Sequence, residues 1–75
     1  MSEQEIIAMM IKIEQLDMFK RVRNTSFREI SEYFDRHNIW KFIDDAYYGL
    51  HVQGALATFD DITGYIQSIE TREAI

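Results

Sequence analysis

His51 is the residue of this sequence best suited to acid–base chemistry, because imidazole titrates near neutral pH and also ligates metals. It stands in the segment Leu50-His51-Val52-Gln53-Gly54, directly after an aromatic-rich stretch. A general base also needs an orienting partner and a cleft, and the sequence shows neither. The alternative is a histidine that fixes a chain corner by hydrogen bonding to backbone. We favour this structural role and expect no catalytic residue.

Two adjacent carboxylate pairs, Asp44-Asp45 and Asp60-Asp61, are the other candidates for chemistry. Neighbouring side chains point in different directions around a helix, so neither pair forms a site by itself. Neither a calcium-loop spacing nor a Glu-x-x-His pattern is present, and cysteine is absent. We therefore expect no metal site and no cofactor. The acidic pairs should lie on solvated faces or supply charge at the N-termini of helices.

Half of the eight basic residues fall in one short region, and these four are Lys20, Arg21, Arg23 and Arg28. They could dock an acidic partner or a nucleic acid. The net charge of −5 argues against general binding to a phosphate backbone. Cations near the end of a helix also compensate its dipole, which accounts for three of the four. Nucleic-acid binding is therefore not expected.

Aromatic residues gather between Ile39 and Gly54, and a chain this short cannot bury all of them. Exposed Trp and Tyr side chains commonly anchor protein interfaces, although internal packing is the alternative. Gln53 should cap unpaired backbone groups at the corner, and Gly54 should supply a permissive dihedral angle. The candidate interaction residues are Trp40, Tyr47, Tyr48, His51 and Gln53.

Length and composition limit the class of protein. Seventy-five residues make one small domain, whose core alone supplies little net stability. Disulfides are excluded because the sequence has no cysteine, so we expect self-association into a homo-oligomer. No apolar run approaches the roughly 18 residues that span a bilayer, and no signal-peptide pattern is present. We therefore expect a cytoplasmic protein without membrane contact.

The absence of proline and the presence of only three glycines favour helices joined by short turns. The first helix should begin at Ser2, which forms a capping box with Glu5, and end at the break from Asn24 to Ser26. Its helical stripe consists of Ile6, Ile7, Met10, Ile11, Ile13 and Leu16, continued by Met18 and Phe19.

Three further helices complete the prediction. The second begins at a capping box of Ser26 and Glu29 and ends at His37-Asn38, where Asn tolerates a left-handed conformation. The third covers residues 39–48 and ends at Gly49, and the fourth runs from about 54 to 70. Residues 1–75 should thus form a single compact, all-α domain of four helices, with a short, apolar third helix at its centre.

The chain resembles a family of small bacterial proteins catalogued as domain of unknown function 3791. That pattern has an aromatic residue ending one helix, a turn, an apolar helix with Tyr, then Leu-His-x-Gln-Gly and an acidic last helix. The position of the turn at His37-Asn38 matches, but the sequence departs from the pattern at Asn38-Ile39-Trp40, where the family tends to carry glycine before its third helix. The matching residues are Ile13, Glu14, Phe34, His37, Asn38, Ile43, Tyr47, Tyr48, Leu50, His51, Gln53, Gly54, Asp60, Asp61 and Ile62.

The resemblance also implies a partner, since members are often encoded beside a protein resembling ADP-ribosyltransferase-like enzymes. We expect a protein–protein interaction module, an antitoxin-like or regulatory partner of a co-encoded enzyme. One alternative is a small enzyme that uses His51 with a nearby carboxylate. Another is a nucleic-acid-binding regulator that uses the cluster from Lys20 to Arg28.

Overall fold

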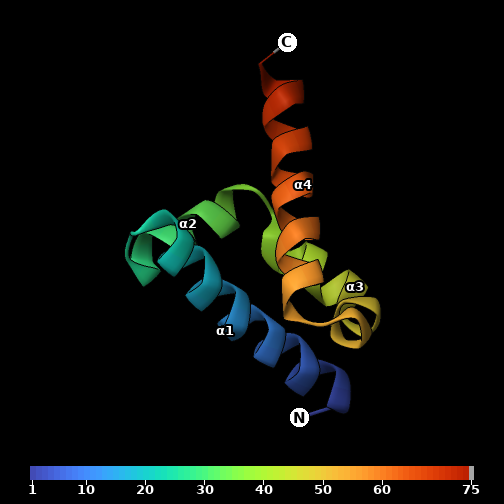
Figure 1. Ribbon diagram of the computed structural model, residues 1–75. Helices are drawn as coiled ribbons and strands as arrows, with labels where there is room; N and C mark the ends of the chain where they lie inside the picture. The colour runs from blue at the N-terminus through green and yellow to red at the C-terminus, as the bar shows by residue number, and fades with distance from the viewer. Residues whose placement is uncertain (75) are drawn as a thin grey trace.

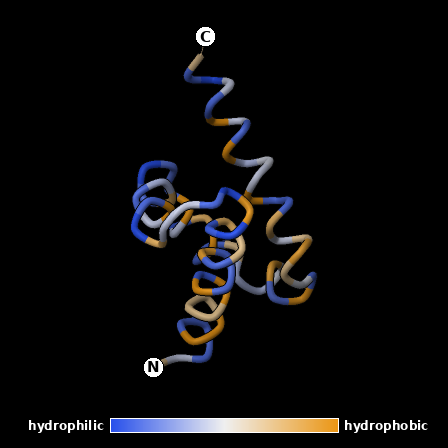
Figure 2. The backbone as a smooth tube through the Cα atoms, turned by 60° about the vertical axis from the view of Figure 1, so that its left-hand side comes forward, coloured by the Kyte–Doolittle hydropathy of each residue, from blue (hydrophilic) through white to orange (hydrophobic). Residues whose placement is uncertain are grey.

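Four helices make up the chain in the computed structural model, which describes residues 1–74. They are α1 (Glu3–Arg23), α2 (Phe27–Arg36), α3 (Ile39–Gln53) and α4 (Ala55–Glu73), and no strand occurs within residues 1–74 (Figure 1). Both α1 and α3 contact all three other helices. The C-terminal turns of α4 extend beyond the other helices (Figures 1 and 2). The all-α, four-helix prediction is confirmed, and α3 shares the central place with α1.

Serine caps start the first two helices, as their sequence pattern predicts. The backbone N–H of Glu5 donates to Ser2 Oγ at 3.2 Å, and that of Glu29 donates to Ser26 Oγ at 3.2 Å. Each capping oxygen satisfies an N–H group that has no partner within its helix. At the turn before α3, Asn38 has φ 60° and ψ 32°, the left-handed conformation. Asn38 therefore adopts the backbone that glycine would adopt with least strain.

The core lies where α1, α3 and α4 meet and is closed at one end by α2. Phe34 is fully buried, and its ring packs edge-on against Phe19 at 5.1 Å and Trp40 at 5.3 Å between centroids. The buried apolar residues are Ala8, Ile11, Phe19, Ile30, Phe34, Ile39, Ile43, Leu50, Ile62 and Ile66.

The apolar residues of α1 form two faces and not the single stripe that the sequence suggests. One face is buried and consists of Ala8, Ile11, Gln15 and Phe19. The other consists of Ile6, Met9, Met10 and Ile13, which are 44–61% exposed. A helix turns by about 100° per residue, so these two sets lie on opposite sides of α1. Apolar residues accordingly recur on successive turns of this helix (Figure 2).

The third helix is longer than predicted, because it continues through Gly49 and ends at Gln53. Glycine in a helix costs only about 1 kcal/mol relative to Ala. Burial of Leu50 beyond Gly49 outweighs this cost. The break comes at Gly54, with φ 92° and ψ 174°, a conformation almost confined to glycine. The predicted permissive dihedral at Gly54 is thus confirmed, whereas the predicted end at Gly49 is wrong.

Replacing each of these two glycines with alanine should have opposite effects on stability. Gly54→Ala should lower the free energy of unfolding by about 1–3 kcal/mol, because a side chain strains this backbone conformation. Gly49→Ala should raise it by about 0.5–1 kcal/mol, since Gly49 is helical and a Cβ there meets nothing within 4 Å. Urea denaturation followed by circular dichroism measures both. Equal effects of the two substitutions would contradict the assignment of the break to Gly54.

Candidate functional site

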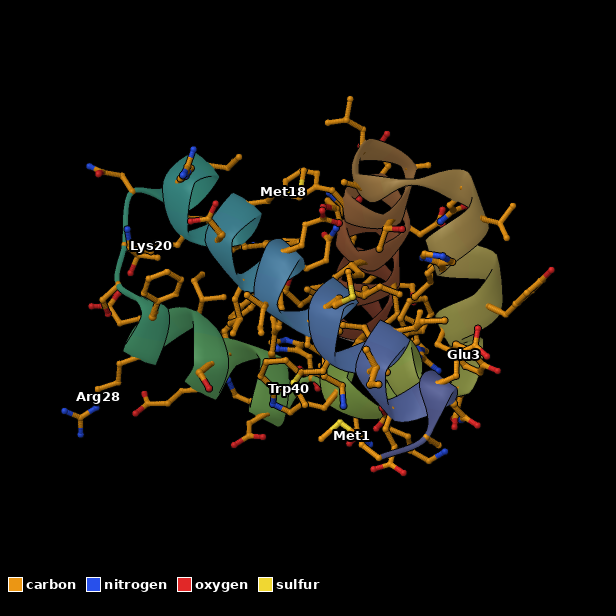
Figure 3. All side chains as sticks on the ribbon, turned by 90° about the horizontal axis from the view of Figure 1, so that it is seen from below. Met1, Glu3, Met18, Lys20, Arg28 and Trp40 are labelled. Atoms are coloured by element: carbon orange, nitrogen blue, oxygen red, sulfur yellow. The ribbon has the colours of Figure 1, made fainter. Side chains whose placement is uncertain are left out.

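A groove of about 440 Å³ lies between the first turns of α1 and the last turns of α3. We call it the α1–α3 groove, and its lining residues are Glu3, Gln4, Ile7, Tyr47, Tyr48, His51 and Val52. Figure 3 shows Glu3 at this end of the molecule, beside α3. Three of the five interaction residues predicted from the sequence, namely Tyr47, Tyr48 and His51, meet in this groove.

The extension of α3 past Gly49 builds one wall of the groove. Tyr48, His51 and Val52 stand at spacings of three and four, so they share one side of the helix. Tyr48 and Val52 are each 68% exposed, whereas Tyr47 is half-buried with its ring edge-on to Tyr48, 6.5 Å between centroids. The wall thus presents an exposed phenol and an exposed valine around the imidazole.

His51 does not hold the chain corner, contrary to the structural role predicted for it. Its side chain is exposed, and within residues 1–74 it makes no hydrogen bond. An enzyme based on His51 requires an accessible pocket with a carboxylate, and Glu3 does line the same groove. General-base catalysis also needs an oriented imidazole, however, and no described side chain orients this one.

Thr58 holds the corner between α3 and α4, and the sequence analysis missed it. Its buried hydroxyl lies 3.0 Å from the carbonyl oxygen of Leu50 and 2.8 Å from that of Gly54. Gln53 was predicted to cap backbone groups, but its Nε2 instead donates to side chains of α4, to Asp61 Oδ2 at 2.8 Å and Thr58 Oγ1 at 3.4 Å. The available signal was a threonine four residues after the glycine, where its hydroxyl reaches back to a carbonyl of the preceding turn.

Trp40 is not brought to the groove. It is half-buried and its ring packs against Phe34, so its first role is in the core. Figure 3 shows it between Lys20 and Glu3 along the molecule. Of the five predicted interaction residues, Trp40 and Gln53 therefore contribute to the fold, and the other three line the groove.

The four residues of the basic cluster are engaged with their own chain. Lys20 Nζ lies 4.9 Å above the Phe27 ring, and Arg23 donates to the Tyr33 hydroxyl at 3.0 Å. Ion pairs link Arg21 to Asp17 at 3.1 Å and Arg28 to Glu32 at 3.6 Å. Figure 3 shows Lys20 and Arg28 at the end of the molecule opposite Glu3. Two of the four charges, Arg21 and Arg28, are therefore compensated by carboxylates, and the other two side chains contact aromatic residues.

The acidic pairs lie on exposed faces, as predicted, but none of their members is in the first turn of a helix. Asp44 pairs with Lys12 of α1 at 2.7 Å, and Asp45 pairs with Lys41 at 2.6 Å. The hydrogen bond to Asp45, helped by the charge of that carboxylate, raises the pKa of Lys41 above its ordinary value. Within residues 1–74 no three His, Cys, Asp or Glu side chains form a group that could hold a metal ion.

The fold and the groove define a small, all-α protein with an open groove between α1 and α3. The family model described as protein of unknown function (DUF3791) matches residues 3–68, and the chain belongs to this family. No curated protein and no solved structure matches it. Among the described helices, none has the length and apolar character needed to cross a membrane.

Proposed function

We propose that this chain is a protein–protein interaction module, without catalytic activity of its own, that binds a partner protein at the α1–α3 groove. The observation that carries this proposal is the exposure of Tyr48 and Val52 beside a groove that also contains Ile7. Large apolar and aromatic side chains left in water around a concave surface are typical of interfaces, where Tyr is a frequent energetic anchor.

The groove favours a partner segment with an apolar side chain and a basic group. Ile7, Tyr48 and Val52 offer apolar contact area, and Glu3 is the acidic residue of the lining. The net charge of the chain, −5, attracts a basic partner over longer distances. The product of the adjacent gene is the first partner to test, in the antitoxin-like or regulatory arrangement implied by the family resemblance.

Truncating the exposed wall of the groove should weaken partner binding. We expect Tyr48→Ala combined with Val52→Ala to raise the dissociation constant for the adjacent gene product at least about tenfold. Truncation of an interface anchor costs about 2 kcal/mol or more, and a tenfold change corresponds to about 1.4 kcal/mol. Isothermal titration calorimetry measures the binding. Val22→Ala is the matched control, since Val22 is 69% exposed at the other end of α1. Unchanged affinity in the double variant would refute the proposal.

Substitutions of His51, measured by the same titration and by an activity assay, separate binding from catalysis. His51→Ala should weaken the complex, whereas any turnover of the partner or its substrate that depends on His51 would instead support the enzyme alternative. A His51→Gln variant keeps a polar side chain of similar reach, so it should retain most of the binding.

A further inference from the structure

The outer face of α1 is a second exposed apolar surface, separate from the α1–α3 groove. We call it the outer stripe, and it consists of Ile6, Met9, Met10 and Ile13. Figure 3 shows α1 in front of the other helices. The buried residues of α1 lie on its opposite side, so the outer stripe faces away from the core. Single exposed apolar side chains are common on protein surfaces, whereas several that adjoin one another are typical of an interaction site.

The order of residues in the outer stripe identifies its occupant. Ile6-x-x-Met9-Met10-x-x-Ile13 reads the same in both directions. In a two-fold symmetric pair of antiparallel helices, each residue meets the residue at the same distance on the other side of the axis. With the axis between Met9 and Met10, Ile6 of one copy meets Ile13 of the other, and the methionines meet at the centre. The stripe is therefore complementary to itself.

The charges of α1 favour the antiparallel direction. Its first turn carries Glu3 and Glu5, and its last turn carries Lys20, Arg21 and Arg23. Antiparallel packing about an axis between Met9 and Met10 keeps the two acidic ends apart, keeps the two basic ends apart and opposes the two helix dipoles. Parallel packing would place like charges side by side at both ends. The outer stripe does not continue past Ile13, because the next position on this side of α1 is Asp17, a charged residue paired with Arg21.

We propose that a second copy of this chain binds the outer stripe, so that two α1 helices pack antiparallel about a two-fold axis between Met9 and Met10. Methionine suits the centre of such a contact, because its flexible side chain fills irregular gaps. Four side chains make a smaller contact than the roughly 20–30 residues per partner of a standard interface, so we expect a weak, concentration-dependent dimer. This site is independent of the proposed partner site.

Solution mass as a function of concentration tests the dimer. Sedimentation of the full chain should show a monomer–dimer equilibrium, and Ile13→Glu should leave only monomer at concentrations where the unaltered chain is dimeric. Val22→Glu is the matched control: it adds the same charge to α1 outside the stripe and should leave the dimer intact. Circular dichroism checks that both variants remain helical, as expected for substitutions at exposed positions.

Cysteine cross-linking tests the direction of the helices, and the chain has no cysteine of its own. Met10→Cys should form a disulfide-linked dimer on mild oxidation, since the two copies of residue 10 lie near the axis. Ile6→Cys should not, because its two copies are about 10 Å apart along the helices, beyond the reach of a disulfide. A mixture of Ile6→Cys and Ile13→Cys chains should give the mixed dimer.

Three results would overturn the proposal. They are a monomer at all concentrations, a dimer insensitive to Ile13→Glu, and efficient cross-linking of Ile6→Cys alone, which indicates parallel helices. The variant with Tyr48→Ala and Val52→Ala should remain dimeric. Titration of the groove variant therefore tests partner binding, and sedimentation of the stripe variant tests self-association, so that either proposal can fail without the other.

Discussion

Phe34→Ala is expected to lower the free energy of unfolding by about 3–5 kcal/mol, the usual cost of truncating a fully buried phenylalanine. Phe34 has no exposed surface, and its ring contacts both Phe19 of α1 and Trp40 of α3. These edge-on contacts add to the loss of buried area. A domain of this size has a total stability of only about 5 kcal/mol. The variant should therefore retain only about 0–2 kcal/mol of stability, so that a measurable fraction of it, up to about half, is unfolded at 25 °C.

Phe27→Ala is the matched control for this experiment. Phe27 lies on the same helix but is 51% exposed, and its ring contacts Lys20 Nζ. Its truncation should cost about 1 kcal/mol or less, since an exposed cation–π contact contributes about 0.5–1 kcal/mol. Thermal unfolding followed by circular dichroism compares the two variants. Similar losses at positions 27 and 34 would contradict the core described above.

Gln15→Ala should have the second largest effect, about 2–4 kcal/mol, similar to truncation of a buried aliphatic side chain. Gln15 is fully buried in the core face of α1. Its Nε2 donates to the carbonyl oxygen of Ala55 at 3.1 Å and contacts Met18 Sδ at 3.7 Å. Alanine removes this link between α1 and the start of α4 and also leaves a cavity. Urea denaturation measures the loss.

Gln15→Leu should be far less costly and separates packing from hydrogen bonding. Leucine keeps most of the volume but gives up a hydrogen bond worth about 1 kcal/mol. It also removes Gln15 Oε1, a buried oxygen that has no partner within the described residues. Burial of such an oxygen costs about 1–3 kcal/mol, so the two contributions offset each other. A loss above about 2 kcal/mol in Gln15→Leu would show that Oε1 contributes a stabilising contact.

The hydrogen bond of Gln15 suits a role in aligning α1 with α4. A hydrogen bond between Gln15 and Ala55 can form in only one relative position of α1 and α4, whereas leucine packs in several. If Gln15 mainly aligns the two helices, Gln15→Leu should leave the free energy of unfolding unchanged or raise it. If Gln15 is a net stabiliser, the same substitution should lower it.

Local features of the fold were predictable because they depend on a few neighbouring residues. The serine caps at Ser2 and Ser26, the left-handed turn at Asn38 and the break at Gly54 each follow from the chemistry of one short segment. The end of α3 was not predictable in the same way. Gly49 weakens a helix locally, but the burial of Leu50 depends on helices distant in sequence.

The candidate site was predictable only in part. The aromatic and histidine content of the region between Ile39 and Gly54 indicated where a surface would lie, and Tyr48 and His51 do line a groove. Their neighbours in it, Glu3 and Ile7, are more than forty residues away in the sequence. Trp40 packs against Phe34 of α2 in the core, and no local sequence pattern predicts this contact.

The amino-acid sequence by itself determined four helices, the serine caps of the first two, the left-handed turn at Asn38 and the break at Gly54, because local hydrogen bonds and backbone preferences decide these. Only the tertiary structure decided which side of α1 is buried. Both sides carry large apolar residues at helical spacing, so periodicity cannot choose between them. The choice depends on fit: Ala8, Ile11, Gln15 and Phe19 pack against the other helices, and Ile6, Met9, Met10 and Ile13 remain exposed.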